Sequence, residues 1–310
     1  MTVKTQFPEH AMHTTRIKKD STQIVISVVT YILVTLFCIM CILPFWMIIA
    51  SSFASEESIR RTGFTLWPAE VSTYSYELLF RSPDQMLGAY AVTIGLTVVG
   101  TAIGLFIVSM TGYALQRKDF PYRNGIMFYI YFTSLFSAGL VPFYLLIVQY
   151  LNLRDSYFAI LLPLLMSPWL IVLMKNFVKA IPHEITESGK IDGAGDFKIF
   201  YALVLPNLKP ALATIGLFLA LSYWNEWYYS SLFLTTKVVY RPLQYHLYNV
   251  INKVASLKNS VAGSNVVITD LPGETLKMAT AVIATGPIIL LYPFVQKYFV
   301  AGLTVGAVKG

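Results

Sequence analysis

The sequence carries very little charge for its length. Only 13% of its 310 residues are Asp, Glu, Lys or Arg, whereas 56% are hydrophobic. A soluble domain usually has about 25% charged residues, because its surface has to be solvated. So little charge excludes a water-soluble globule of this size and predicts that most of the surface faces lipid. The formal charge of +7 suits an anionic membrane face better than a nucleic acid, since no compact basic stripe is present.

Groups that could perform catalysis or bind a metal are also scarce. The two cysteines, Cys38 and Cys41, lie in one apolar run, where buried thiols are usually inert packing residues. The four histidines are scattered without the spacing of metal ligands. No GxxxxGK[ST] segment occurs, so the chain lacks the usual nucleotide-binding loop. We therefore expect no catalytic residue, no metal and no cofactor bound by this chain.

Long apolar runs are what the chain has instead. The first run, 24–50, would extend roughly 40 Å as a helix, which is enough to cross a bilayer. It is longer than the apolar part of a secretory signal, so we expect an uncleaved transmembrane helix. The prediction is an all-α polytopic membrane protein with six transmembrane helices, at 24–50, 88–115, 125–150, 156–175, 211–234 and 276–295.

Glycine and proline mark special positions in these spans. The third span is predicted to break near Gly139 and Pro142, and the fourth contains Pro163 and Pro168. Such breaks either line a translocation pathway or only improve packing, and both interpretations stay open. The second span has a pair of small residues that allows close helix packing, namely Gly100 and Gly104.

Six spans place both ends of the chain on one side of the membrane. Residues 1–23 and 299–310 are predicted to be cytoplasmic tails of a membrane domain at 24–298. With this orientation most Lys and Arg residues are inside, as the positive-inside rule requires. A polar segment, 182–210, is then cytoplasmic, and a long loop, 235–275, is external.

The cytoplasmic segment 182–210, called the hairpin below, predicts two short helices. Gly193 and Gly195 interrupt the first helix, and Asp196 is a candidate N-cap of the second. Pro206 is expected to end the second helix. The second helix is predicted to have one apolar face, formed by Phe197, Phe200, Tyr201 and Val204. Such a hairpin suits either a groove on a partner protein or the bilayer surface.

The hairpin resembles the EAA loop, the coupling motif of permease subunits in bacterial ABC importers. One departure is Ser188-Gly189, where Ala-Ala is usual; both residues are small enough for close docking, although Gly189 makes the helix less rigid. The resemblance implies that Glu187 makes charge-assisted contacts with an ATPase and that Gly193 allows close approach at the turn. The coupling residues it implies are Glu187, Ser188, Gly189, Asp192, Gly193, Ala194, Phe200, Leu205 and Pro206.

The resemblance covers most of the chain. The order of spans and the segments SLFSAGLVPFYLL and YWNEWYYS are similar to carbohydrate-importing permeases, the class that contains the maltose permease MalG. The ending GLTVGAVKG and the long external loop resemble the LplC/YtcP-like branch, which is associated with complex oligosaccharides. The resemblance implies a multi-pass subunit of the bacterial cytoplasmic (inner) membrane. Its implied partners are a second permease in a heterodimer, two ATPase subunits that bind ATP and Mg, and an extracytoplasmic substrate-binding protein.

Two external features are candidates for contacts with substrate or partners. Aromatic rings stack on sugars and polar edges bind hydroxyls, although Trp and Tyr also form interfacial belts. The candidates for the substrate pathway are Tyr223, Trp224, Asn225, Glu226, Trp227 and Gln149. In the external loop, apolar residues at helical spacing are expected to lie on the membrane surface or to contact the binding protein; they are Leu243, Leu247, Val250 and Val254.

These observations favour the permease subunit of an ATP-driven ABC importer that moves an oligosaccharide into the cytoplasm by alternating access. A permease of the same family for a non-sugar solute is one alternative. A secondary transporter or channel that needs no ATPase is another; it is disfavoured by the EAA-like hairpin and by the lack of an internal repeat. A membrane enzyme comes third, because no cluster of acids or histidines is present.

Overall fold

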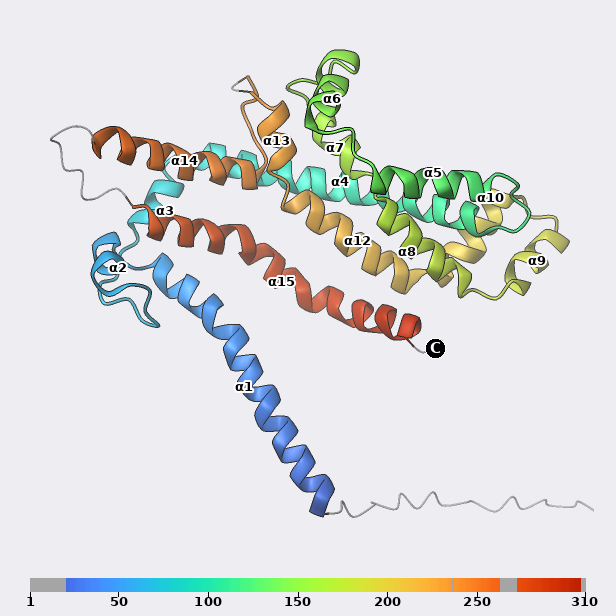
Figure 1. Cartoon of the computed structure of the whole chain (residues 1–310), viewed down its shortest axis with the longest axis horizontal. Coiled ribbons are helices and arrows are strands. Elements are labelled where there is room, and N and C mark those ends of the chain that lie inside the picture. The colour runs from blue at the N-terminus through green and yellow to red at the C-terminus, as the bar shows by residue number, and fades with distance from the viewer. Residues whose placement is uncertain (1–20, 236, 263–271, 308–310) are drawn as a thin grey trace, which may run out of the picture. The chain divides into compact units, whose positions relative to one another are not determined.

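The computed structural model describes residues 21–235, 237–262 and 272–307 (Figure 1). The chain divides into two units, residues 1–47 and 48–310, and helix α1 (Ser21–Ser52) continues from the first into the second. The described residues are helical apart from turns, loops and one isolated bridge between Ala54 and Val71, as an all-α prediction requires. Most of the predicted N-terminal tail, residues 1–20, lies outside the described residues.

Helix α1 is apolar on every side and exposed along most of its length, as a lipid-facing span is. It covers the first predicted span, with Pro44 inside it. Cys38 and Cys41 are free and exposed on this helix. The expectation that these thiols are inert packing residues stays a prediction.

The other predicted spans correspond to one straight helix, several broken ones and a long terminal helix. The second span is α4 (Pro83–Gln116), and α15 (Glu274–Ala307) covers the sixth. The third span consists of α5 (Arg123–Leu135), α6 (Leu140–Leu145) and the π-helix η1 (Leu146–Tyr150). The fourth consists of α7 (Phe158–Leu164) and α8 (Pro168–Lys179), and the fifth of α12 (Lys209–Trp224) and α13 (Tyr228–Phe233). By length and composition, up to five of the described segments are candidate spans when bent pairs are counted as one.

The predicted breaks in the third and fourth spans are present. The third bends by 115° at Gly139, whose φ of 88° favours glycine, while Pro142 lies inside α6. The fourth bends by 45° before Pro168, the first residue of α8, where a missing N–H costs nothing. Helix α15 also extends beyond the predicted start of the C-terminal tail at 299, as far as Ala307.

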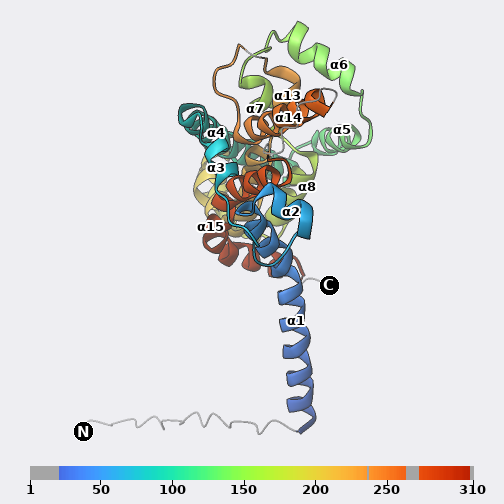
Figure 2. The same ribbon diagram turned by 90° about the vertical axis from the view of Figure 1, so that its left-hand side faces the viewer.

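Three apolar clusters hold the second unit together, of which the smallest joins η1, α7 and α13 through Ile147, Ala159 and Phe233. The first joins α4, α8, α12 and the hairpin, and includes Val108, Met174, Phe200 and Ile215. The second joins α4, α12, α15 and α14 (Leu243–Ala262), and includes Met86, Trp224, Leu247 and Ala279. Helix α4 contributes to the first and second clusters. Figure 2 shows the unit from the end that carries α2 (Glu56–Thr62), α3 (Tyr74–Leu79) and α14.

Helix α14 confirms the helical spacing predicted in the external loop but not the role of its apolar face. Leu243, Leu247 and Val254 are buried, and Val250 is partly buried, in the second cluster. The backbone N–H of Leu243 also donates to Thr93 Oγ1 of α4 at 2.7 Å. The apolar face therefore packs inside the chain, because α4 and α15 already cover it, and it is not free for a membrane surface or a binding protein.

Candidate functional site

The hairpin consists of two arms joined by a glycine turn. The first arm is α9 (Glu184–Ile191), and Gly193 then adopts a φ of 74°, which only glycine adopts readily. The second arm contains α10 (Asp196–Lys198), π-helix η2 (Ile199–Val204) and α11 (Leu205–Asn207). The N-cap of α10 is Gly195, so the prediction that Asp196 is the N-cap is wrong: Asp196 is the first helical residue, and its carboxylate pairs with Arg117.

The predicted apolar face of the second arm is only half right. Phe200 and Val204 are buried, whereas Phe197 and Tyr201 are 62% and 63% exposed. The i→i+5 bonds of η2 shift side chains around the axis relative to an α-helix, so Ile199 turns inward instead. The prediction that Pro206 ends the second helix is wrong, since Pro206 lies in the first turn of α11.

The lack of a side chain at Gly189 allows the two arms of the hairpin to pack closely. A Cβ at this position would lie 2.7 Å from Leu203 Cδ1 and 3.1 Å from Ile199 Cγ1 in the second arm. Gly189 is buried by this contact, so it holds the two arms together. Ala194 and Leu205 are partly buried against the same cluster, and Pro206 is exposed.

The outer side of the hairpin is charged and partly apolar. The predicted coupling residues Glu187, Ser188, Asp192 and Gly193 are all exposed. Glu187 Oε1 lies 3.7 Å from His183 Nε2, and its side chain is 62% exposed. Ile191, which was not among the predicted coupling residues, is 85% exposed on the first arm. Large apolar side chains exposed beside charges are typical of a protein interaction surface.

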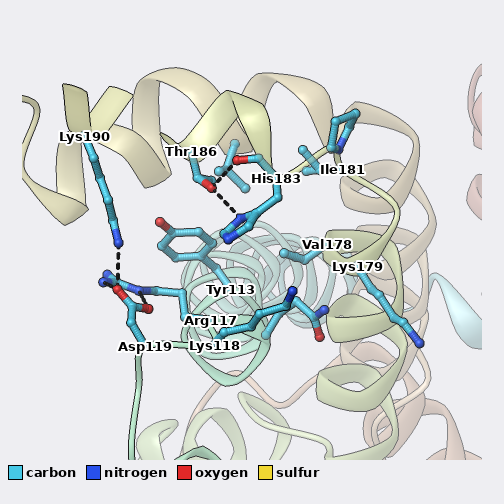
Figure 3. Close-up of a pocket in the computed structure, with 13 residues that line it drawn as sticks. Tyr113, Arg117, Lys118, Asp119, Val178, Lys179, Ile181, His183, Thr186 and Lys190 are labelled. Atoms are coloured by element: carbon cyan, nitrogen blue, oxygen red, sulfur yellow. Dashed lines mark hydrogen bonds and ion pairs between the residues drawn. The ribbon is translucent and has the colours of Figure 1, made fainter. Parts of the chain in front are cut away.

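An ionic network that spans long sequence separations connects the hairpin to the end of α4 (Figure 3). Arg117 donates from Nε and Nη2 to the two oxygens of Asp119, at 2.9 and 2.6 Å, and Arg117 Nη1 lies 2.7 Å from Asp196. Lys190 Nζ donates to Asp119 Oδ2 at 2.7 Å. The two cations hold the pKa of Asp119 well below its usual range, mainly through the hydrogen bond from Arg117, so this carboxylate is charged at neutral pH.

The predicted substrate residues divide into buried and exposed groups. Tyr223, Trp224 and Glu226 are at most 7% exposed. Tyr223 Oη donates to the carbonyl of Leu161 at 2.9 Å, and Trp224 Nε1 donates to that of Ala284 at 3.0 Å. The Glu226 carboxylate accepts hydrogen bonds from the first turn of α13. In this conformation these three side chains are occupied by contacts within the chain.

The exposed residues Asn225 and Trp227 belong to a surface that we call the aromatic ledge. Its other members are Tyr228 and Tyr248, which are exposed, and Gln244, which is partly exposed. The rings of Trp227 and Tyr248 are 4.9 Å apart, and Gln244 Nε2 donates to Asn225 Oδ1 at 3.4 Å. Gln244 and Tyr248 were missed because their partners lie about twenty residues earlier, across the α12–α13 break. Gln149 is exposed at the end of η1, and no described interaction joins it to the ledge.

The chain is similar to known transport proteins over most of its length. The family model described as "Binding-protein-dependent transport system inner membrane component" matches residues 110–305. The polygalacturonan/rhamnogalacturonan transport system permease protein YtcP of Bacillus subtilis is 39% identical over 277 residues, covering 89% of this chain and 95% of that protein. Protein LplC of the same organism is 36% identical over 271 residues, covering 87% and 90%.

A solved structure is similar as well. The crystal structure of a bacterial ABC transporter involved in the import of the acidic polysaccharide alginate matches with a TM-score of 0.74 and 28% identity. The match covers 91% of this chain and 99% of that one. The family model covers well over half of the chain, so the chain belongs to the family of inner membrane components of binding-protein-dependent transport systems.

Proposed function

We propose that this chain is a permease subunit of an ATP-driven importer that moves an oligosaccharide from a binding protein into the cytoplasm. It lies in the bacterial cytoplasmic membrane with six spans and both termini inside. A second permease completes the pore, and two separate ATPase subunits bind ATP and Mg. The observation that carries the proposal is the hairpin, an exposed charged element fixed to α4, in a chain of the transport family.

In this mechanism the ATPases move the hairpin, and α4 carries the movement into the membrane. Glu187 is the contact to the ATPase, and Gly189 keeps the two arms moving as one body. Arg117 and Asp119 fix both arms to the end of α4. The 34 residues of α4 extend about 50 Å and reach the contact with α14 at Thr93.

The test is a pull-down of the tagged full-length subunit from native membranes in mild detergent, with the partners identified by mass spectrometry. We expect an ATPase, a second permease and a sugar-binding protein. Recovery of this chain alone from a verified intact extract would instead indicate a self-sufficient transporter or channel.

Removing the charge of Asp119 is expected to uncouple ATP hydrolysis from transport. Asp119→Asn weakens the bonds to Arg117 and Lys190 while keeping the shape of the side chain. Exposed ion pairs contribute little to stability, so the complex should assemble normally. We expect the ratio of transport to ATP hydrolysis to fall about fivefold, in the range usual for coupled sites. Lys118→Gln, which neutralises the adjacent exposed side chain, is the control, and an equal loss there would contradict the assignment.

Removing the ring of Trp227 is expected to change the sugar selectivity of uptake. The ledge presents aromatic faces and amides, which suit the C–H faces and hydroxyls of a sugar. Trp227→Ala should lower uptake of the preferred oligosaccharide about tenfold, as loss of a stacking anchor typically does, whereas Trp227→Phe should retain most of it. Uptake is measured for a panel of oligosaccharides, with the exposed Tyr122 changed to alanine as control. Unchanged uptake of every sugar by Trp227→Ala would remove the ledge from the pathway.

A further inference from the structure

We propose that a cationic cavity beside α14 binds the carboxylate of an acidic saccharide. This inference rests on the proposed function, because it names the class of sugar. The cavity has a volume of about 470 Å³, within the range of small-molecule sites. It lies between the segment that leads into α4, the loop before α14, and α14 itself. None of its twelve lining residues is an acid.

Three permanent cations from three segments line this cavity. They are Arg81 before α4, Arg241 before α14, and Lys253 within α14. Among the described residues none of the three forms a salt bridge with an acid. Arg241 is held in place by its bond to the carbonyl of Thr235 at 3.2 Å and lies 5.5 Å from the ring of Tyr245. Converging cations without a counter-charge favour an anionic ligand, because arginine and lysine bind carboxylates well.

The remaining polar residues of the cavity suit a sugar rather than a simple ion. Ser82, Gln85 and Asn249 supply hydroxyl and amide groups without adding charge. Burial and the positive charges of Lys253 and Arg241 lower the pKa of His246, which therefore stays neutral and can donate or accept a hydrogen bond. A uronic acid offers this combination, a carboxylate on a ring of hydroxyls.

The cavity is distinct from the aromatic ledge. Its residues on α14 are spaced three, four and seven apart, at 246, 249, 250 and 253, so they share one side of the helix. Gln244 and Tyr248 of the ledge occupy a different side, and the buried stripe with Leu243 and Leu247 separates the two. The cavity therefore captures acidic sugars at the end of the structure away from the hairpin, and the ledge contacts the sugar ring independently of charge.

The experiment compares trigalacturonate with its methyl ester, which has the same sugar framework without charge. Binding to the purified importer, in the absence of its binding protein, and uptake by the complete system are both measured. Arg241→Gln and Lys253→Gln should each weaken trigalacturonate binding about tenfold, as loss of a charge-assisted hydrogen bond does, and leave the methyl ester unaffected. Lys237→Gln, the same charge change on an exposed residue of the same loop outside the cavity, should alter neither.

Three results would overturn the inference. The first is equal binding of trigalacturonate and its ester by the wild-type importer. The second is an equal loss for both sugars in Arg241→Gln, together with weaker affinity for the binding protein, which would assign the cavity to an acidic side chain of that protein. The third is an unchanged affinity for trigalacturonate in both variants. Arg241→Lys is measured beside them because it keeps the charge, so a loss of binding in this variant would indicate a folding defect. Failure of the importer proposal would be recognised separately, because no ATPase would then co-purify.

Discussion

Glu187→Ala is expected to abolish most substrate-dependent ATP hydrolysis and uptake while leaving the subunit inserted and folded. Its side chain is 62% exposed, and its described neighbour is His183 at 3.7 Å, so the substitution should change the free energy of unfolding by no more than about 0.5 kcal/mol. Across an interface the same carboxylate becomes desolvated, and its truncation typically costs about 2–5 kcal/mol. We therefore expect at least about a thirtyfold loss, which is what the lower limit of about 2 kcal/mol corresponds to.

The measurement is uptake and ATP hydrolysis per inserted complex, quantified by immunoblot and by co-purification of the ATPase. Glu184→Ala is the matched control, because Glu184 is also exposed and begins the same helix. Wild-type uptake by Glu187→Ala at a normal inserted amount would show that the hairpin does not use this carboxylate for coupling.

Gly100→Ala is expected to destabilise the membrane domain itself. A methyl group at this position would overlap the ring of Tyr223, which is 1% exposed and fixed by its bond to Leu161. The ring cannot move without breaking that bond or separating α4 from α12. We expect a loss of stability at the upper end of the about 1–3 kcal/mol usual for overpacked cores.

Thermal unfolding of the detergent-solubilised complex, followed by size-exclusion chromatography, measures this effect. Gly95→Ala on the same helix is the control, since nothing lies within 4 Å of its added methyl group. Adding Tyr223→Leu to Gly100→Ala should restore part of the stability by making room. A wild-type melting temperature for Gly100→Ala would contradict the close packing of α4 on α12.

The sequence predicted features that depend on local pattern. Apolar length predicted the helices, Gly139 and Pro168 marked the breaks, and Gly193 marked the turn of the hairpin. The small residues Gly100 and Gly104 correctly indicated close packing, since both lie against α12. Each of these signals comes from a residue whose own backbone or size limits the structure.

Features that depend on tertiary contacts could not be predicted. Asp119 and Lys190 are 71 residues apart, so nothing local indicates their ion pair. Phe200 packs against Phe106 and Tyr113 of α4, whereas Phe197 and Tyr201 stay exposed, and no local pattern indicates which side of the second arm meets α4. Trp224 and Trp227 look equivalent in sequence, yet the break between α12 and α13 buries one and exposes the other.

Helix α12 separates the hairpin from the aromatic ledge: the hairpin leads into its N-terminal end, and the ledge begins at its C-terminal end, beside α13 (Figure 1). Its 16 residues put about 24 Å between the two. Under the proposed function, substitutions in the ledge therefore leave the surface that contacts the ATPase unchanged. Under that function, the residues that contact the sugar and those that contact the ATPase can change independently during evolution.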